Sequence, residues 1–309
     1  MQLSDTFSKQ PAVGENDSAP EAHLPLLHTP PERFFRQHVH PVPKINLAYW
    51  SFMLGGLVTR PIVLSYDDLL SCASTEQPSV LACIGNPPGG PLMASAQWTG
   101  VPLGDLLAEA RAHHVAQHAH LYAADGYATS IPLEWAQRAL LVYRMNNAPI
   151  PPEHGGPVRL IVPGLYGYKM PKWIQRIVLA ETPLPGIWEQ RGWSPVGVVQ
   201  TTTGIVTPQH LEATHGPVLF TGIAYAGTRA VTRVEISIEN GPWTPADFVP
   251  GLPDTLTRWH ALWTPPAPGD YRVSARATDE TGGVQPDTGA TFPNGATAAH
   301  TIVVRVISS

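Results

Sequence analysis

The chain has 309 residues, enough for about two ordinary domains. Hydrophobic residues make up 43% of it and charged residues only 14%, so the chain is neither a disordered polyelectrolyte nor a long solvated helix. Its 19 basic and 24 acidic residues give a formal charge of −5, which excludes the basic character typical of nucleic-acid-binding proteins. No stretch approaches the ~18 apolar residues of a membrane-spanning helix.

The numbers of glycines, prolines and cysteines narrow the class of protein further. The 27 glycines and 34 prolines predict short strands and loops in place of long helices. Two cysteines are too few for a disulfide scaffold or a cysteine-rich zinc site. The first 22 residues lack the features of a secretory signal and a twin arginine, so we expect a cytoplasmic protein, or a periplasmic one if a leader was removed.

Composition and residue patterns along the chain indicate an N-terminal tail followed by a first domain. Residues 1–28 are polar and dotted with proline, as in a surface tail. Residues 29–185 are predicted to form a mixed α+β domain. A capping box at 65–68 starts a short helix, and leucines at helical spacing predict another over 103–110. Strands are expected at 79–83, 120–122, 126–128, 140–144, 158–162 and 174–179.

Residues 195–309, after a proline-rich linker, are predicted to form an all-β domain. Turn residues separate expected strands at 218–224, 231–238, 258–263, 271–277 and 301–306. In 231–238 the side chains alternate, as in a strand with one buried face. This spacing is typical of a β-sandwich, and we expect an immunoglobulin-like architecture.

Cys83 ends an apolar strand and enters a glycine turn. Considered alone, it has two interpretations: a small buried hydrophobic residue, or a thiolate that binds a soft transition metal or acts as a nucleophile. No histidine or acid lies close in sequence to complete a Cys–His pair. Spacing alone does not decide between them.

An ordered set of motifs places this cysteine in context. They are Thr29-Pro30 with FFRQHVHPVP at 34–43, CIGN at 83–86, WTGVPL at 98–103 with Leu106-Leu107, DGYATS at 125–130, MNN at 145–147, HGGPVRLIVPG at 154–164, YGYKMPKWI at 166–174, RVEIS at 233–237, GPW at 241–243, RATD at 276–279 and QP at 285–286. Together they resemble the sulfite oxidase family of molybdopterin-dependent oxidoreductases, across residues ~29–309.

The resemblance implies a molybdenum cofactor. The metal is held by a pterin dithiolene and by the Cys83 thiolate, and Tyr127 corresponds to the active-site tyrosine, a hydrogen-bond donor or proton shuttle. The implied pterin contacts are Arg36, His38, His154, Arg159 and Lys172, with Trp173 packed beside them. Arg36 is also a candidate catalytic residue. From the residues alone, a structural ion pair for each arginine and a core aromatic for Tyr127 stay open.

Two further observations bear on anion binding. Only four lysines occur, and two of them, Lys169 and Lys172, lie in one glycine-bearing loop, which favours an anion site over a surface loop with chance lysines. The stretch after Cys83, however, is Pro87-Pro88-Gly89-Gly90-Pro91, where sulfite oxidases carry a substrate-binding arginine. Arg36 and the segment 258–263 are the candidates to replace that charge.

The predicted function is two-electron oxygen-atom transfer, with sulfite to sulfate as the first choice. Alternatives are an S-oxide or N-oxide reductase on the same centre, and an inactive interaction protein. No C-x-x-C-H haem motif occurs, so electrons are expected to pass to oxygen or a separate carrier such as a cytochrome. The family implies a homodimer formed through the second domain. A zinc site among His113, His114, His118 and His120 is the weaker alternative to an exposed helix end.

Overall fold

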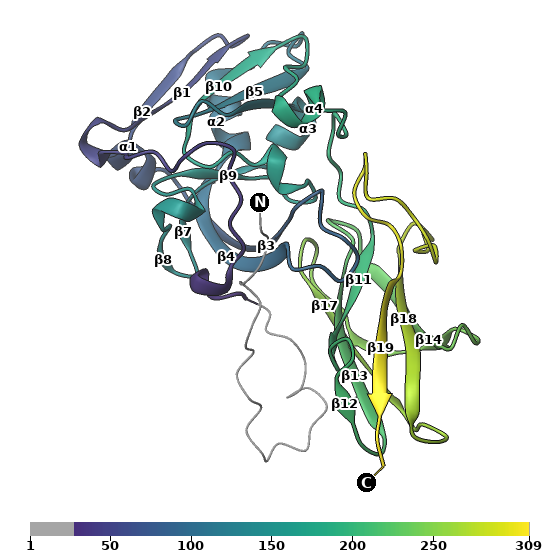
Figure 1. The fold of residues 1–309 in the computed structure, drawn as a ribbon. Helices are drawn as coiled ribbons and strands as arrows, with labels where there is room; N and C mark the ends of the chain where they lie inside the picture. The colour runs from purple at the N-terminus through teal and green to yellow at the C-terminus, as the bar shows by residue number, and fades with distance from the viewer. Residues whose placement is uncertain (1–27, 309) are drawn as a thin grey trace. The chain divides into compact units, whose positions relative to one another are not determined.

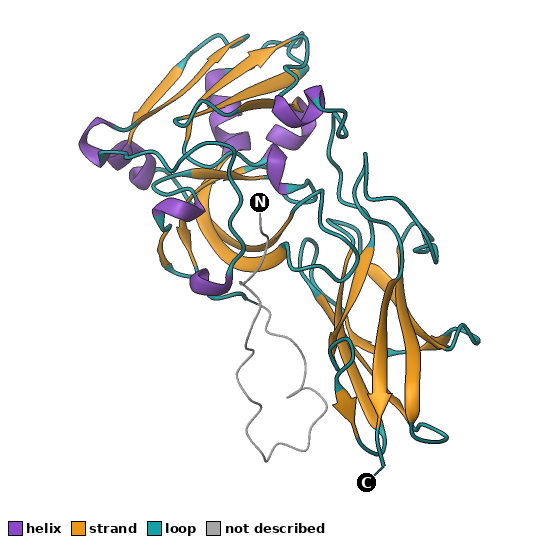
Figure 2. Cartoon of the chain, in the orientation of Figure 1, coloured by secondary structure: helices purple, strands orange, loops and turns teal. Residues whose placement is uncertain are grey.

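The computed structural model describes residues 28–308, so nearly all of the predicted tail lies outside it (Figure 1). The described chain is mostly β, with a few short helices (Figure 2). It divides into two compact units. One comprises His28–Cys83 and Ala94–Val198, and the other comprises Ile84–Met93 and the chain from Val199 onward.

The first unit contains two five-stranded sheets. The first has the order β2 (Ile62–Ser65), β1 (Ser51–Gly56), β10 (Ile174–Ala180), β5 (His118–Ala123) and β6 (Ala128–Pro132). Its β1–β10 pair is parallel and the other pairs are antiparallel. The second has the order β3 (Thr75–Ala82), β4 (Met93–Pro102), β7 (Leu140–Met145) and β8 (Ala148–Pro149), with β9 (Arg159–Ile161) paired to β7. Five of the strands predicted in this region are confirmed, whereas the strand predicted at 126–128 is shifted, because β6 begins only at Ala128 and residues 126–127 belong to the preceding turn.

Short helices complete this unit. In α1 (Tyr66–Ser71) the Ser65 hydroxyl accepts from the Asp68 amide and the Asp68 carboxylate accepts from the Ser65 amide, which confirms the predicted capping box. The predicted helix α2 (Leu103–Ala110) is confirmed and buries its apolar stripe in the core. Single turns are found at α3 (Leu133–Ala136), α4 (Ile187–Gln190), η2 (Pro31–Arg33), η3 (Leu47–Tyr49), η4 (Pro152–His154) and η5 (Gly167–Lys169).

The second unit is a two-layer β-sandwich. One sheet has the order β11 (Thr202–Thr207), β13 (Val218–Tyr225), β17 (Thr257–Trp263) and β16 (Asp247–Val249). The other has the order β12 (Ala213–Thr214), β19 (His300–Val306), β18 (Gly269–Asp279), β14 (Val231–Ile238) and β15 (Thr244–Pro245). Phe220 and Trp259 from the first sheet share one core with Val273 and Ile302 from the second. The predicted strands are confirmed.

Strand β14 departs from the predicted alternation. Its register shifts between Val231 and Arg233, and Glu235 and Ser237 are buried although they were expected on the polar face. Glu235 tolerates burial because Arg276 on the neighbouring strand β18 donates to its carboxylate at 3.0 Å. Pairing with an opposite charge therefore overrides the simple polar pattern here.

The residues directly after Cys83 belong to the second unit. Gly89 has φ of +66° and lies so close to the His300 ring that a β-carbon would clash with it. His300 is itself held because its Nδ1 accepts from the Ile205 amide at 3.0 Å. Consequently the glycine-proline stretch 87–91 is packed in the second unit, while Cys83 is the last residue of a segment of the first unit.

In the described residues, no helix has the length and apolar character that a membrane span needs.

Candidate active site

The segment 166–173, which contains η5, lies against the end of the strand that leads to Cys83. A β-carbon on Gly167 would be 3.5 Å from the carbonyl oxygen of Ala82, the last residue of β3. The next residue of the segment, Tyr168, accepts a 2.6 Å hydrogen bond at its carbonyl from the Tyr127 hydroxyl. The predicted thiolate ligand and the predicted active-site tyrosine therefore both adjoin one end of this segment. Cys83 is half-buried and is not in a disulfide.

The other end of the segment carries Lys172 and Trp173. The Lys172 ammonium donates to the Glu153 carbonyl at 2.8 Å, and the Trp173 indole donates to the Pro152 carbonyl at 2.8 Å. Gly155 makes this close approach possible: its φ is +106°, and a β-carbon there would be 2.9 Å from the Lys172 β-carbon. Only glycine adopts such a backbone without strain.

Arg159 is the most buried cation of the site. Its side chain is 2% exposed, donates to the His154 carbonyl at 2.7 Å and stacks 5.4 Å from the centre of the Trp98 ring. Its Nε has no hydrogen-bond partner, and none of the ion pairs in the described chain involves it. Burial lowers the pKa of Arg159 to about 9. A buried guanidinium with an N–H to spare is suited to an anionic or polar ligand.

Two histidines lie near the positive charge of Lys172. His154 is buried, with Nε2 2.9 Å from the Pro31 carbonyl, and its ring lies 5.6 Å from that of Phe34. Burial lowers the pKa of His154, with the charges of Lys172 and Arg159 adding to the shift. The His38 ring lies 6.0 Å from the Trp173 ring, and burial and the Lys172 charge lower the His38 pKa. Both imidazoles are therefore biased toward the neutral form.

Lys172 experiences the same accumulation of positive charge. Burial, followed by the charges of Arg159 and Arg36, lowers the pKa of Lys172 to about 7, against the opposing influence of nearby carboxylates. Arg36 is 48% exposed and lies 3.7 Å from the Glu153 carboxylate. The five residues predicted as pterin contacts thus lie together, and we call them the cationic cluster: Arg36, His38, His154, Arg159 and Lys172.

The hydroxyl proton of Tyr127 is already used in a hydrogen bond. Its hydroxyl donates to the Tyr168 carbonyl, which leaves the phenolic oxygen able to accept a hydrogen bond from elsewhere. Burial, followed by the charge of Glu189, raises the pKa of Tyr127 well above its ordinary value. The side chain is therefore a neutral phenol at physiological pH, and its role toward a substrate stays a prediction.

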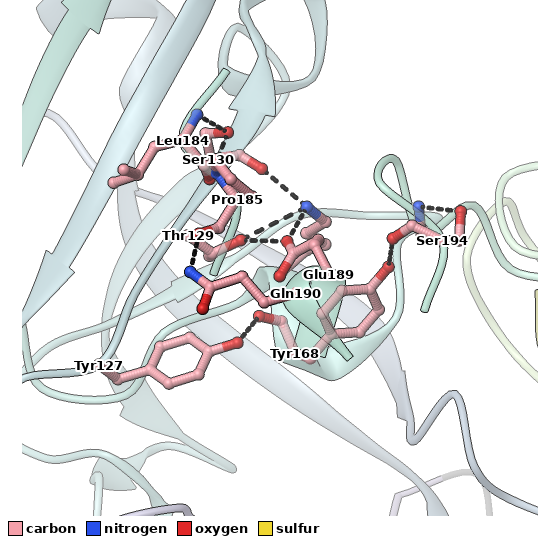
Figure 3. A network of polar contacts seen from close by, with 11 residues as sticks. Tyr127, Thr129, Ser130, Tyr168, Leu184, Pro185, Glu189, Gln190 and Ser194 are labelled. Carbon is pink, nitrogen blue, oxygen red and sulfur yellow. Dashed lines mark hydrogen bonds and ion pairs between the residues drawn. The ribbon is translucent and has the colours of Figure 1, made fainter. Parts of the chain in front are cut away.

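Lys169 does not take part in the anion site that the paired lysines predicted. Its side chain is 1% exposed and forms an ion pair with Glu189, while its ammonium also donates to the Ser130 carbonyl at 2.9 Å (Figure 3). The alternative of chance surface lysines is wrong for Lys169 too, because it is fully buried. Its counter-charge comes from the predicted linker, a pairing that no local spacing reveals.

Carboxylates of the site were not singled out from the sequence. Asp125 is 4% exposed; one of its oxygens accepts from the Tyr127 amide at 3.0 Å and the other lies 3.5 Å from His40 Nδ1. Its position in an Asp-Gly turn before Tyr127 was the available signal. For Glu153 the available signal was its position directly before His154, the first residue of a family motif.

The other residues that the sequence offered as candidates lie in or beside ordinary secondary structure outside the cationic cluster. His118 and His120 lie on β5, where His120 Nε2 is 2.7 Å from the Thr182 carbonyl, and the described residues contain no group of three acidic, histidine or cysteine side chains able to hold a metal. Cys72 directly follows α1, and its thiol donates to the Asp68 carbonyl at 3.4 Å. The segment 258–263 forms β17 of the second unit.

Comparisons with known proteins show what this chain is similar to. Residues 39–188 match the oxidoreductase molybdopterin binding domain family. An uncharacterized oxidoreductase, YuiH, of Bacillus subtilis is 30% identical over 172 residues, which cover 55% of this chain and 80% of that protein. Mitochondrial sulfite oxidase of Rattus norvegicus is 27% identical, covering 93% of this chain and 64% of its own length.

Longer relatives and a solved structure extend the comparison. An NADPH nitrate reductase of Fusarium oxysporum is 28% identical over 67% of this chain, which spans only 29% of that enzyme. The sulfane dehydrogenase SoxCD of Paracoccus pantotrophus superimposes with a TM-score of 0.79 over 98% of this chain and 89% of its own, at 24% identity. At that identity the likeness concerns the fold.

The family match and these relatives show a molybdopterin-binding oxidoreductase. Within that class, the chain belongs to the sulfite oxidase family. The residues present fit a molybdenum cofactor: Arg159 keeps an unpartnered buried N–H, Gly155 leaves space where a β-carbon would clash, and a thiol stands at the end of β3.

Proposed function

We propose that the chain catalyses two-electron oxygen-atom transfer, with sulfite as the first candidate substrate. Sulfite and water give sulfate, two protons and two electrons, and the electrons pass to oxygen or to a separate carrier such as a cytochrome. The bound molybdenum cofactor supplies the redox chemistry and the oxygen transfer. The protein supplies binding, orientation and electrostatics.

The cationic cluster is the observation that carries this proposal. Within the described residues, Arg159 is buried with no carboxylate partner, and Lys172 lies near the charges of both Arg159 and Arg36. An excess of buried positive charge of this kind is expected of a site for an anionic ligand. Arg159 and Lys172 would hold the pterin and its phosphate, with His38 and His154 as hydrogen-bonding partners. The thiolate of Cys83 would ligate the metal, which needs one soft protein ligand.

Two residues are candidates for contact with the substrate. The Arg36 side chain is 48% exposed, so it can attract an oxyanion toward the site. Tyr127, a neutral phenol beside the Cys83 end of segment 166–173, would orient the substrate or exchange its proton with it. Both roles belong to the same reaction, so we expect substitutions of either to lower turnover without removing the metal.

Reduction of an S-oxide or N-oxide is the second candidate. The stretch 87–91 carries no cation where sulfite oxidases carry an arginine, so binding of a doubly charged anion has less support. Nitrate reductases also occur among the relatives. Steady-state assays with artificial electron dyes, comparing sulfite with a panel of S-oxides and N-oxides, distinguish the two directions.

Metal analysis tests the cofactor assignment directly. We expect purified chain to contain molybdenum and Cys83→Ser to lose it, whereas Cys72→Ser, which changes the other cysteine, keeps it. Retention of molybdenum in Cys83→Ser would refute Cys83 as the ligand. Absence of turnover on every substrate by fully loaded protein would instead favour an inactive interaction protein.

We also propose that the second unit is an immunoglobulin-like dimerisation domain, with domains near 29–185 and 195–309. The sheet orders β11-β13-β17-β16 and β19-β18-β14-β15 correspond to the A-B-E-D and G-F-C-C′ orders of immunoglobulin domains, which supports the assignment. A monomer in sedimentation at micromolar concentration would refute the two-fold dimer. The cytoplasmic location stays a prediction.

A further inference from the structure

A buried polar network joins β6, which follows Tyr127, to the linker helix α4 (Figure 3). At its centre Lys169 and Glu189 form an ion pair, with side chains 1% and 5% exposed. Thr129 on β6 donates from its hydroxyl to the Glu189 carboxylate at 2.6 Å, and Lys169 donates to the Ser130 carbonyl at 2.9 Å. None of these groups belongs to the cationic cluster, so the proposed chemistry leaves the network unexplained.

The network reaches Tyr127 through the backbone of a single residue. Tyr168 precedes Lys169 in the chain, and its carbonyl accepts the proton of the Tyr127 hydroxyl. The hydroxyl of Tyr168 donates in turn to the carbonyl of Ser194 in the linker. Tyr168 is therefore fixed on two sides, by the ion pair of its neighbour and by its own hydroxyl, and both fixed points lie on the segment 189–194.

The charge of this network also acts on the phenol. Glu189 is the largest charged influence that raises the pKa of Tyr127, after burial itself. One carboxylate oxygen of Glu189 is buried without a hydrogen-bond partner, so its negative charge is not fully neutralised. The phenol proton is consequently favoured, and it is held toward the Tyr168 carbonyl.

We propose that Glu189 is a positioning residue for Tyr127: paired with Lys169, it holds the Tyr168 carbonyl where that carbonyl orients the Tyr127 hydroxyl. The segment 189–194, which the sequence predicted to be a linker, is thereby part of the active-site architecture of the first unit. The inference rests on the proposed function, because the orientation of Tyr127 affects turnover only if Tyr127 acts in the reaction.

The test uses the holoenzyme and two measurements. Tyrosines labelled with carbon-13 at the hydroxyl-bearing carbon report the state of each phenol by NMR, and the Tyr127 signal is assigned by its loss in Tyr127→Phe. The second measurement is kcat per bound molybdenum for Glu189→Gln, Tyr127→Phe and the double variant, a double-mutant cycle. Arg229→Gln is the matched control, because it removes a partly buried ion pair with Asp279 in the second unit.

In Glu189→Gln we expect the Tyr127 signal to move and kcat to fall about tenfold or more, since misplacement of a reacting group by ~1 Å costs on the order of 10²-fold. In the Tyr127→Phe background the same substitution should change kcat little. Arg229→Gln should move neither readout. An unchanged Tyr127 signal in Glu189→Gln, or losses in kcat that add fully, would overturn the proposal.

A second variant leaves the charged pair of Lys169 and Glu189 intact. Thr129→Val keeps the shape of the side chain and removes only the hydroxyl that donates to Glu189, so it should move the Tyr127 signal in the same direction by a smaller amount. The NMR readout also separates the two proposals. If the loaded wild-type enzyme transfers oxygen to or from no substrate, the proposed function fails, while the Tyr127 signal still decides whether Glu189 positions that side chain.

Discussion

The two ends of segment 166–173 use the same residue type in opposite ways. Lys169 is fully buried and is compensated by Glu189. Lys172, three residues later, donates to a backbone carbonyl, lies over the Trp173 ring and faces two arginine charges. The first arrangement fixes the backbone and the second leaves positive charge to be neutralised. The comparison teaches that the counter-charge, and not the lysine itself, separates a structural cation from a binding one.

Substitution of the compensated lysine should have the largest effect. Lys169→Met leaves the Glu189 carboxylate buried without its partner, so we expect a loss of about 3–5 kcal/mol in the free energy of unfolding. Denaturant unfolding of the apoprotein measures it. A loss below ~1 kcal/mol would mean that the pair is not buried in solution.

Gly155→Ala tests how tightly the other end is packed. The new β-carbon would be strained at φ of +106° and would press on the Lys172 side chain, so we expect a loss of about 1–3 kcal/mol together with reduced molybdenum content. Gly126→Ala is the control for backbone strain, because its φ is +88° but nothing lies within 4 Å of the new β-carbon. Equal metal loss in both variants would contradict a role for the Gly155 space in cofactor binding.

Lys172→Met should stabilise the apoprotein while weakening cofactor binding. The folded-state pKa of about 7 lies below the ordinary value of a lysine, so the unfolded chain binds more protons between about pH 7 and 10. The wild-type apoprotein therefore gains stability as pH rises through this window, and Lys172→Met does not. At pH 7 we expect the variant to be more stable by on the order of 1–2 kcal/mol. A less stable variant at pH 7 would contradict this account.

The smallest effect is expected at the exposed pair between Arg36 and Glu153. Both side chains are more than a third exposed and 3.7 Å apart, so Glu153→Gln should change the free energy of unfolding by less than about 0.5 kcal/mol. High salt should abolish even that difference. Comparison with Lys169→Met then isolates burial as the factor that makes an ion pair matter in this chain.

Much of the fold follows from local sequence. The capping box at Ser65 and the leucines of 103–110 are confirmed as helices because capping and a 3.6-residue period act within one turn. The strands of the second unit are confirmed because turn residues bound each apolar run. The polar alternation over 231–238 is wrong at Glu235, since the arginine that compensates it comes from a neighbouring strand.

In the site, too, some features could be predicted from the sequence and others depend on contacts between distant residues. The family motifs in the sequence predicted the five members of the cationic cluster. In the structure all five lie near one another, although they come from parts of the chain far apart in sequence. The Asp125 carboxylate and the Glu189 linker contact went unrecognised, and Lys169 was grouped with the binding lysines.

The amino-acid sequence by itself determined most of the elements and the family motifs, among them the motif whose resemblance assigns Cys83 to the metal. Only the tertiary structure decided which charges are compensated: Glu189 reaches Lys169 from twenty positions away, while Arg159 is buried with no carboxylate partner among residues 28–308. The physical reason is that periodicity and capping depend on neighbours in the chain, whereas charge compensation depends on neighbours in space.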